Sequence, residues 1–292
     1  MKRYSPAAAK QRGMAIISAL LIAAVVAVIA GAMLTRQSVF TRSLEAEQAR
    51  IQGQWLLQGG LERSRQLLWE VRQKDVLTRL DQPWARAQNG VFDGQIEDEQ
   101  GKFNLRNLVN RQRLDTEQLQ SFERLCRLIR VDPAVSRRIS QRVIASYDQP
   151  DLPAKYPMLR SLDDLSAIEG LDPQVLQRMQ AYISVLPGNT WVNGNTARAE
   201  VLSAVVPQLS LAQAQALVAE RDGGHWFINR GDFVNRLRMP QVAVESVQVG
   251  ITSEWFRLQG QARREQRRVT IEALLHRPED RMPRVIWSRV GA

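Results

Sequence analysis

The sequence is 292 residues long, 44% hydrophobic and 24% charged, so the chain can bury a sizeable core. Its 40 basic residues against 30 acidic ones give a formal net charge of +10, which leaves an anionic membrane surface, nucleic acid or an acidic protein open as partners. One cysteine, Cys126, excludes an intrachain disulfide and a cysteine-rich zinc site. The two histidines, His225 and His276, lie too far apart for an HExxH metal motif.

The N-terminus joins a basic segment to a long apolar one. Residues 1–13 carry four basic side chains and no acid, and residues 14–34 are apolar except for Ser18 and Gly31. A helix over residues 14–34 is about 31 Å long, which matches the hydrocarbon core of a bilayer. The basic flank predicts a cytoplasmic N-terminus and export of the remaining chain.

A basic segment followed by an apolar one occurs in three kinds of export segment: secretory signal peptides, signal anchors and prepilin leaders. A secretory signal peptide has a shorter apolar run and a small-x-small cleavage site, whereas Thr35-Arg36-Gln37 follows the run here. A plain signal anchor fits the length and stays open. A basic leader that ends in Gly13 and continues into Met-Ala-Ile-Ile resembles the N-terminus of prepilins. That resemblance implies cleavage between Gly13 and Met14, N-methylation of Met14, and retention of the helix as membrane anchor and filament stem.

Ser18 occupies the fifth position of the mature chain, where prepilins usually carry glutamate. In a filament that carboxylate neutralises the N-terminal ammonium of the subunit in front, because an unpaired charge in an apolar stem is costly. A subunit at the very tip has no subunit in front of it. Ser18 therefore indicates either a tip subunit or a protein that is not a pilin.

The predicted helix continues to about Arg79 with apolar residues at helical spacing. We expect one apolar stripe along it, formed by Leu57, Leu61, Leu68 and Val71 and joined by Ile51 and Trp55. Gly59-Gly60 predicts a bend, and Asp81-Gln82-Pro83 ends the helix.

Strand patterns flank a helical region. A strand is predicted just after Gly90, and further strands lie around Trp255, over residues 269–275 and over residues 284–288. Between them, short helices have recognisable N-termini at Asp115, Asp132-Pro133, Ser161…Asp164, Asp172-Pro173 and Ser210…Gln213. The fold class predicted is an α/β pilin-like fold, a long N-terminal helix plus a small antiparallel sheet, with an inserted all-α domain.

The predicted organisation has five parts. They are a prepilin leader at 1–13, a transmembrane or filament-stem helix at 14–34, the rest of the pilin helix and the first strand at 35–106, an inserted helical domain at 107–240, and C-terminal strands that complete the sheet at 241–292.

Several motifs follow one another in an order that is similar to one family. They are Asp98-Glu-Gln-Gly-Lys-Phe-Asn-Leu-Arg-Asn-Leu108, Ser161-Leu-Asp-Asp-Leu, Gly170, Leu186-Pro187, Val192-Asn193-Gly-Asn195-Thr196-Ala197, Glu200-Val-Leu, Ala219-Glu-Arg221 and Ser253-Glu-Trp-Phe. The chain resembles, over nearly its whole length, the K-type minor pseudopilins of type II secretion, the general secretion pathway protein K family. Ser18 conforms to that family, whose K-type members lack the usual glutamate, whereas Gly194 departs from its common apolar residue.

The resemblance implies a subunit at the tip of a pseudopilus that secretes folded proteins across the outer membrane. The implied partners are the I- and J-type minor pseudopilins, the inner-membrane secretion assembly and the prepilin peptidase, with secreted cargo as a further candidate. The implied location is the bacterial inner membrane, with a single pass, a cytoplasmic N-terminus and a periplasmic head. The implied role is structural and not enzymatic, and no nucleic acid is expected.

Two acidic segments raise the question of metal binding. Some members of the family bind calcium in the helical domain, but the segment here, residues 147–153, is short and lacks the carboxylates of a 6–8-oxygen site. Asp93, Glu97, Asp98 and Glu99 are interpreted as exposed acids around a strand end. We expect no cofactor.

The Asn193, Asn195 and Thr196 side chains admit two roles, a recognition loop or, as we expect, hydrogen-bonded caps of the following helix. The region after them also resembles helix-hairpin-helix DNA-binding modules, although Val206-Pro207-Gln208-Leu209 lacks the phosphate-binding glycines. An exported, membrane-anchored DNA-binding protein is therefore the second hypothesis for function. A hydrolase on a signal anchor is a third, without a GxSxG or Walker motif in its favour.

Overall fold

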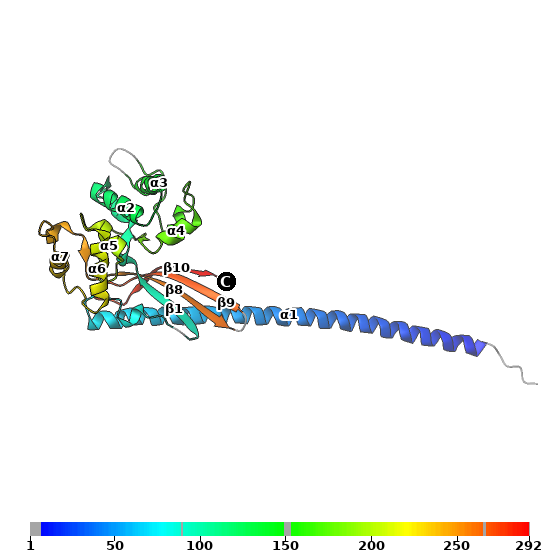
Figure 1. Ribbon diagram of the computed structural model, residues 1–292. Coiled ribbons are helices and arrows are strands. Elements are labelled where there is room, and N and C mark those ends of the chain that lie inside the picture. Colours follow the sequence, from blue (N-terminus) through cyan, green and yellow to red (C-terminus); the bar gives the residue numbers. More distant parts are fainter. Residues whose placement is uncertain (1–6, 89, 149–152, 265–266, 292) are drawn as a thin grey trace, which may run out of the picture. The chain divides into compact units, whose positions relative to one another are not determined.

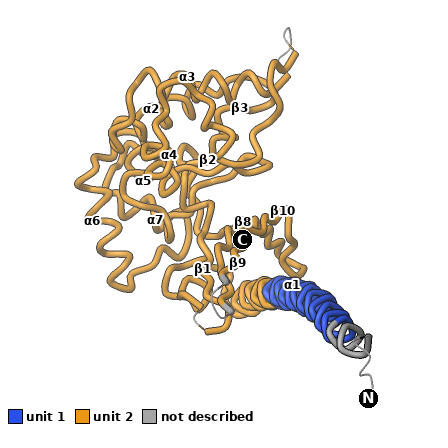
Figure 2. Tube along the Cα trace, turned by 90° about the vertical axis from the view of Figure 1, so that its right-hand side faces the viewer, with its two compact units in different colours: residues 1–55 blue, residues 56–292 orange. Residues whose placement is uncertain are grey.

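The computed structural model describes residues 7–88, 90–148, 153–264 and 267–291 (Figure 1). The chain divides into two compact units, Met1–Trp55 and Leu56–Ala292 (Figure 2). Helix α1 spans Ala7–Lys74, so it supplies the described part of the first unit and the opening segment of the second.

A four-stranded antiparallel sheet forms one half of the larger unit. Its strands are β1 (Phe92–Asp98), β8 (Trp255–Arg264), β9 (Arg267–His276) and β10 (Arg284–Gly291), in the order β1-β8-β9-β10. Strand β1, which precedes the helices in the sequence, thus pairs with β8, which follows them. This confirms the predicted fold class, a small sheet interrupted by a helical insertion.

The last turns of α1 pack on one face of this sheet. The side chains buried between them include Leu57, Leu61, Leu68, Val71, Ile96, Phe256, Leu258, Ile271 and Leu275. The prediction that Ile51 and Trp55 share this stripe was wrong, because their side chains are 42% and 71% exposed. Trp55 precedes Leu57 by two residues and so points about 200° away around the helix.

The helix continues through Gly59-Gly60, where the sequence predicted a bend. Gly60 faces the ring of Phe92, which overlaps the position that a Cβ atom on Gly60 would occupy. The same ring lies against Gly94 and Gly260 on the sheet. The missing side chains therefore allow the helix, the ring and two strands to approach closely.

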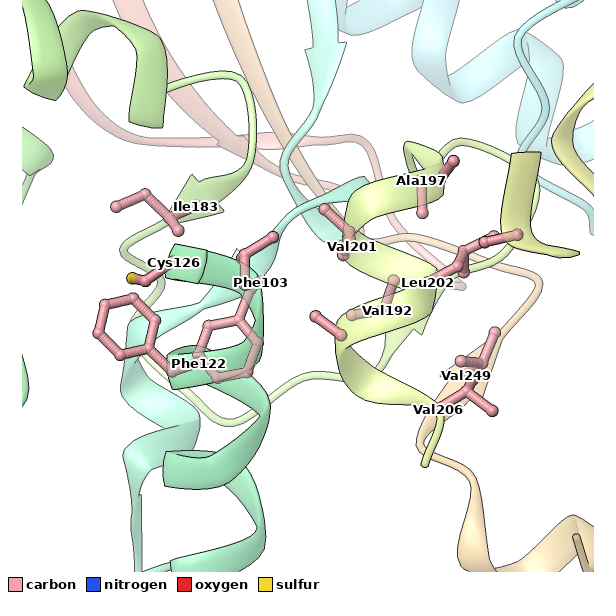
Figure 3. Close-up of a cluster of buried hydrophobic side chains, with 14 of the residues drawn as sticks. Phe103, Phe122, Cys126, Ile183, Val192, Ala197, Val201, Leu202, Val206 and Val249 are labelled. Atoms are coloured by element: carbon pink, nitrogen blue, oxygen red, sulfur yellow. The ribbon is translucent and has the colours of Figure 1, made fainter. Parts of the chain in front are cut away.

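The helical insertion carries its own hydrophobic core. Its helices are α2 (Thr116–Leu128), α3 (Pro133–Ile144), α4 (Pro173–Met179), α5 (Ala199–Val205), α6 (Leu211–Asp222) and α7 (Arg230–Leu237). The residues labelled in Figure 3 belong to this core and come from α2, α5 and the segments beside them. Cys126 is among them, and burial raises the pKa of its thiol to about 11, so it acts as a small buried hydrophobe.

Predicted helix starts are confirmed where the side chain caps the helix. The side chains of Asp115, Asp132, Asp172 and Ser210 each accept a hydrogen bond from a backbone N–H in the first turn. The Ser161–Asp164 capping box opens a single 3-10 turn, η4 (Leu162–Leu165). The remaining 3-10 turns are η1 (Pro83–Ala85), η2 (Glu99–Gly101), η3 (Leu105–Leu108) and η5 (Val244–Ser246).

Two-residue strands, which the sequence did not predict, tie the segments together. Parallel pairs form between β2 (Phe103–Asn104) and β5 (Ile183–Ser184), and between β6 (Val192–Asn193) and β7 (Val249–Gly250). An antiparallel pair joins β3 (Val109–Asn110) to β4 (Arg113–Leu114). The β6–β7 pair holds the start of the Asn-Gly-Asn-Thr-Ala motif.

Candidate functional site

The predicted cleavage position lies within α1, where Gly13 and Met14 are both helical. Residues 1–6 of the predicted leader lie outside the described residues. The Ser18 hydroxyl donates a hydrogen bond to the Met14 carbonyl at 2.9 Å. The hydroxyl is therefore satisfied within its own helix and needs no partner from a neighbouring chain when its surroundings are apolar.

The apolar run that follows is exposed in the structure. An 18-residue window of the helix has a mean hydropathy of 2.8, and none of it is buried. The helix is therefore long and apolar enough to cross a membrane. Its exposed apolar surface requires an apolar environment outside this chain.

The second predicted group, Asn193 to Ala197, forms a buried turn at the junction of the insertion and the sheet. Asn193 Oδ1 accepts a hydrogen bond from the Asn195 amide at 2.9 Å, and the Ala197 amide donates to the Asn193 carbonyl at 2.9 Å. Both asparagine side chains are fully buried. Buried amides of this kind are retained only when their polar atoms find partners.

Asn193 Nδ2 points at three acceptors from distant parts of the chain. It lies 3.1 Å from the Thr78 carbonyl, 3.1 Å from Asp98 Oδ2 and 2.8 Å from Ser253 Oγ. Thr78 follows α1, Asp98 ends β1, and Ser253 precedes β8. One side chain thus joins the motif to three segments of the pilin-like core.

Asp98 is the centre of this arrangement. Its Oδ2 accepts hydrogen bonds from Thr196 Oγ1 and Ser253 Oγ, both at 2.6 Å, in addition to the one from Asn193. Its Oδ1 accepts from the Gln100 amide at 2.8 Å. Burial raises the pKa of Asp98, and these four hydrogen bonds to the carboxylate oppose that shift.

Arg277 supplies a buried positive charge beside Asp98. Its Nη2 donates to Thr78 Oγ1 at 2.7 Å and to the Ser253 carbonyl at 2.8 Å, and its guanidinium lies 4.6 Å from the centre of the Phe256 ring. Burial lowers the pKa of Arg277 to about 10, while the charge of Asp98 acts in the opposite direction. Arg277 is therefore charged at neutral pH. We call Thr78, Asp98, Asn193, Ser253 and Arg277 the junction network.

Asn195 fixes the other side of the motif. Its side-chain oxygen accepts from the Phe227 amide at 2.8 Å, and its side-chain nitrogen donates to the Phe227 carbonyl at 2.9 Å. Arg221 on α6 donates to the carbonyls of Gly194 at 2.9 Å and Ala197 at 2.6 Å. The motif is therefore bonded to the insertion on one side and to the sheet on the other.

The expected capping role of this motif was wrong. Helix α5 begins at Ala199 with Arg198 as its N-cap residue, and no side chain caps it. Asn193 instead caps its own turn, and Thr196 donates to Asp98. The motif side chains bind distant segments because the turn buries them before the helix begins.

A second charged group, also at the end of β1, was misjudged from the sequence. Asp98 and Glu99 are buried rather than exposed. Lys102 Nζ lies 2.7 Å from Glu99 Oε1 and 3.0 Å from Glu97 Oε2, and Arg257 Nη2 lies 2.7 Å from Glu97 Oε2. Burial acts to raise the pKa of Glu97, but the charges of Lys102 and Arg257 together lower it to about 2.

No metal centre is evident in the part of the chain that the structure describes. Its histidine, cysteine, aspartate and glutamate side chains form no group of three or more that could hold an ion. Residues 149–152 of the segment considered for calcium lie outside the described residues. The expectation that calcium does not bind there stays a prediction.

The chain was compared with known proteins. Models of the family "Type II secretion system (T2SS), protein K" match residues 101–188 and 192–252, together about half of the chain. The chain belongs to the type II secretion system protein K family. The matched regions begin at the end of η2 and just before the Asn-Gly-Asn-Thr-Ala motif, so they cover most of the insertion and, of the junction network, Asn193.

Relatives and a solved structure agree with this assignment. The chain is 26% identical to the type II secretion system protein K of Pseudomonas aeruginosa, over 96% of this chain and 93% of that protein. It is 28% identical to the protein of the same name from Klebsiella pneumoniae, over 74% of this chain and 77% of that protein. Its fold is similar to a chain in the crystal structure of the GspK–GspI–GspJ complex of enterotoxigenic Escherichia coli, with a TM-score of 0.67, 16% identity, and coverage of 85% and 99% of the two chains.

Members of this family are structural components of the type II secretion system. The chain is accordingly a pseudopilin of type II secretion, as the sequence motifs predicted. The alternative of an exported DNA-binding protein has no support from these comparisons. The sequence did not reveal Thr78 and Ser253 as partners of the motif, or Arg277 as the partner of these two residues, because they lie far apart along the chain.

Proposed function

We propose that this chain is a minor pseudopilin at the tip of the type II secretion pseudopilus, cleaved between Gly13 and Met14 and N-methylated at Met14. The observation that carries this proposal is the continuity of α1. The helix runs from before the cleavage position to Lys74, and its last turns form part of the core of the larger unit. Cleavage after Gly13 would leave the apolar helix attached to the head, whereas signal-peptide cleavage would remove it.

Ser18 supports the tip position. Its hydroxyl is already bonded to the Met14 carbonyl, so it neither needs nor offers a charge partner in an apolar filament stem. A glutamate at the same position would need the N-terminal ammonium of a subunit in front. A chain without that carboxylate suits the one place in the filament where no subunit lies in front.

The proposed partners follow the solved complex, in which GspK is assembled with GspI and GspJ. We assign this chain the corresponding I- and J-type minor pseudopilins, the inner-membrane secretion assembly and the prepilin peptidase, with secreted cargo as a further partner. The leader at 1–13 lies in the cytoplasm, the span at 14–34 in the inner membrane, and the head in the periplasm. The role is structural, with no catalytic step and no cofactor.

The proposal is tested by changing the cleavage position. Gly13→Val in a strain that lacks its own copy is expected to block processing and to abolish secretion of a folded reporter enzyme, because the β-branched side chain obstructs the peptidase. The head is expected to keep its fold, which limited proteolysis measures. A control substitution in the leader, Gln11→Ala, should leave processing intact. Normal secretion by a chain that stays unprocessed would contradict the proposal.

A further inference from the structure

A groove runs along the free edge of strand β1, within the larger unit. β1 is an outer strand of the sheet, with β8 as its neighbour on the other side. Residues 95–98 of β1 line one wall of the groove, which has a volume of about 700 Å³. The opposite wall belongs to the insertion and includes Gln177 on α4, Glu200 on α5 and Val218 on α6. A strand edge that faces helices across an open space is an arrangement that binds extended peptides.

The hydrogen bonds of Gly94 show which backbone groups of β1 point into the groove. Gly94 donates to the Gln88 carbonyl at 2.8 Å and accepts from the Gln88 amide at 2.7 Å, so both of its backbone groups point away from β8. In an antiparallel pair, successive residues direct their N–H and C=O groups alternately to the two sides of the strand. The register of β1 with β8 is regular from Phe92 to Asp98. The N–H and C=O of Ile96 therefore point to the same side as those of Gly94.

Ile96 presents these two backbone groups to the groove without a partner. Gln88 forms an isolated bridge with Gly94, and the chain before Gln88 is folded into η1. Within the part of the chain that the structure describes, neither the N–H nor the C=O of Ile96 makes a hydrogen bond, although the residue is only 2% exposed. An unpaired backbone group in such a position costs free energy. A second chain that enters the groove as a strand removes this cost.

The groove is formally neutral, since four acidic and four basic side chains line it. Several of them are paired within the chain. Glu97 Oε2 accepts from Lys102 at 3.0 Å and from Arg257 at 2.7 Å, and Arg221 donates to Asp222 at 2.8 Å. Amide side chains also line the groove, those of Gln95, Gln177, Gln180 and Gln259. Such a surface suits an uncharged polar segment, because a charged one would have to compete with these ion pairs.

We propose that this groove binds an extended, uncharged segment of a cargo protein, which adds to the sheet as a further strand and pairs with the backbone of Ile96. The inference rests on the proposed function and adds the site and the mode of binding to the cargo assigned there. Main-chain hydrogen bonds accept segments of different sequence. This tolerance suits cargo proteins that differ from one another, whereas a companion subunit of fixed sequence does not need it.

Site-specific photocrosslinking in secreting cells tests where the cargo lies. A benzophenone amino acid replaces Val218 or Asp222, which line the groove from α6, and the matched control positions are Ala216 and Glu220. Each control lies two residues away on the same helix, is exposed, and points about 200° away from the groove. The groove positions are expected to give an adduct with the secreted reporter enzyme, at least tenfold stronger than the control positions give.

Hydrogen exchange tests the addition of a strand. The processed full chain, purified in detergent, is incubated with the purified reporter enzyme, and exchange is measured by mass spectrometry resolved to single amides. The Ile96 amide is expected to exchange at least tenfold more slowly when the reporter is present. The Gln95 amide is the control, because it points towards β8 and its exchange should stay within twofold.

Processing at Met14 and secretion of the reporter are measured in the same cells, so failure of the groove is distinguishable from failure of the proposed function. When both depend on this chain, equal adduct yields at all four positions, adducts with a companion subunit in place of the reporter, no adduct, or unchanged exchange at Ile96 would overturn the groove alone. An unprocessed chain, or secretion that does not need it, would overturn both proposals. Ala181→Trp, which fills the groove, is also expected to reduce secretion more than tenfold, whereas Ala212→Trp, at an exposed position outside the groove, leaves it within twofold.

Discussion

Asn193→Ala is the change that probes the junction network most directly. Asn193 occupies a fully buried position, and its side chain makes four hydrogen bonds to the rest of the head. Truncation removes the partner of the Thr78 carbonyl and the partner of the Asn195 amide. It also leaves Asp98 with three of its four hydrogen bonds.

The expected cost follows from the groups that lose their partners. A buried donor or acceptor left unsatisfied costs about 1–3 kcal/mol, and here the Thr78 carbonyl and the Asn195 amide are both stranded. Weaker stabilisation of the buried Asp98 charge and the small cavity add to this. We expect the free energy of unfolding to fall by about 3–5 kcal/mol. With a urea dependence of about 2–3 kcal/mol per M, the unfolding midpoint moves down by about 1.5 M.

Urea denaturation of a soluble fragment that begins at Phe40, followed by circular dichroism, measures this shift. Asn235→Ala is the matched control, because Asn235 is an exposed asparagine on α7 and its truncation should change stability by less than about 0.5 kcal/mol. If Asn193→Ala also falls within 1 kcal/mol of the unmodified fragment, the network does not hold the insertion to the sheet and the assignment is wrong.

Three further substitutions test the packing and charge of the head. Gly60→Ala should lower stability by about 1–3 kcal/mol because the new methyl group overlaps the Phe92 ring. Gly59→Ala should raise stability by about 0.5–1 kcal/mol, because the space around Gly59 is open and alanine favours the helix. Equal effects of the two substitutions in thermal denaturation would refute the close contact between Gly60 and Phe92. The pKa of Glu97 is about 2 in the folded head, below its ordinary value, so the ionised form stabilises the fold above about pH 4.5 and this contribution is lost as the pH falls towards 2. Glu97→Gln should therefore flatten the fall in urea midpoint between pH 5 and pH 3, and parallel curves for the two proteins would contradict this.

Local signals predicted the elements of the fold well. Asp132-Pro133 and Asp172-Pro173 each begin a helix where the sequence places them, because capping depends on residues within one turn. That the early strand near Val91 joins the late strands in one sheet was also predicted, and β1 pairs with β8. Trp55 was misplaced for a geometric reason, as its angular position around the helix is opposite to that of Leu57.

The site was predicted less well because its contacts are distant in sequence. Asn193 reaches Thr78 across 115 residues and Asp98 across 95. An Asn-Gly-Asn-Thr sequence followed by a helix has the composition of an N-cap, and only the burial of the turn directs these side chains elsewhere. The processing residues Gly13, Met14 and Ser18 were proposed from a local pattern, and the proposal about their chemistry depends on a peptidase outside this chain.

The account depends above all on the apolar helix remaining attached to the head after export. Intact-mass analysis of the protein purified from membranes of cells that contain a prepilin peptidase tests this directly. We predict a chain that begins at Met14 and carries one additional methyl group on its N-terminal amine. A full-length chain, or a chain cut beyond Leu34, would contradict it.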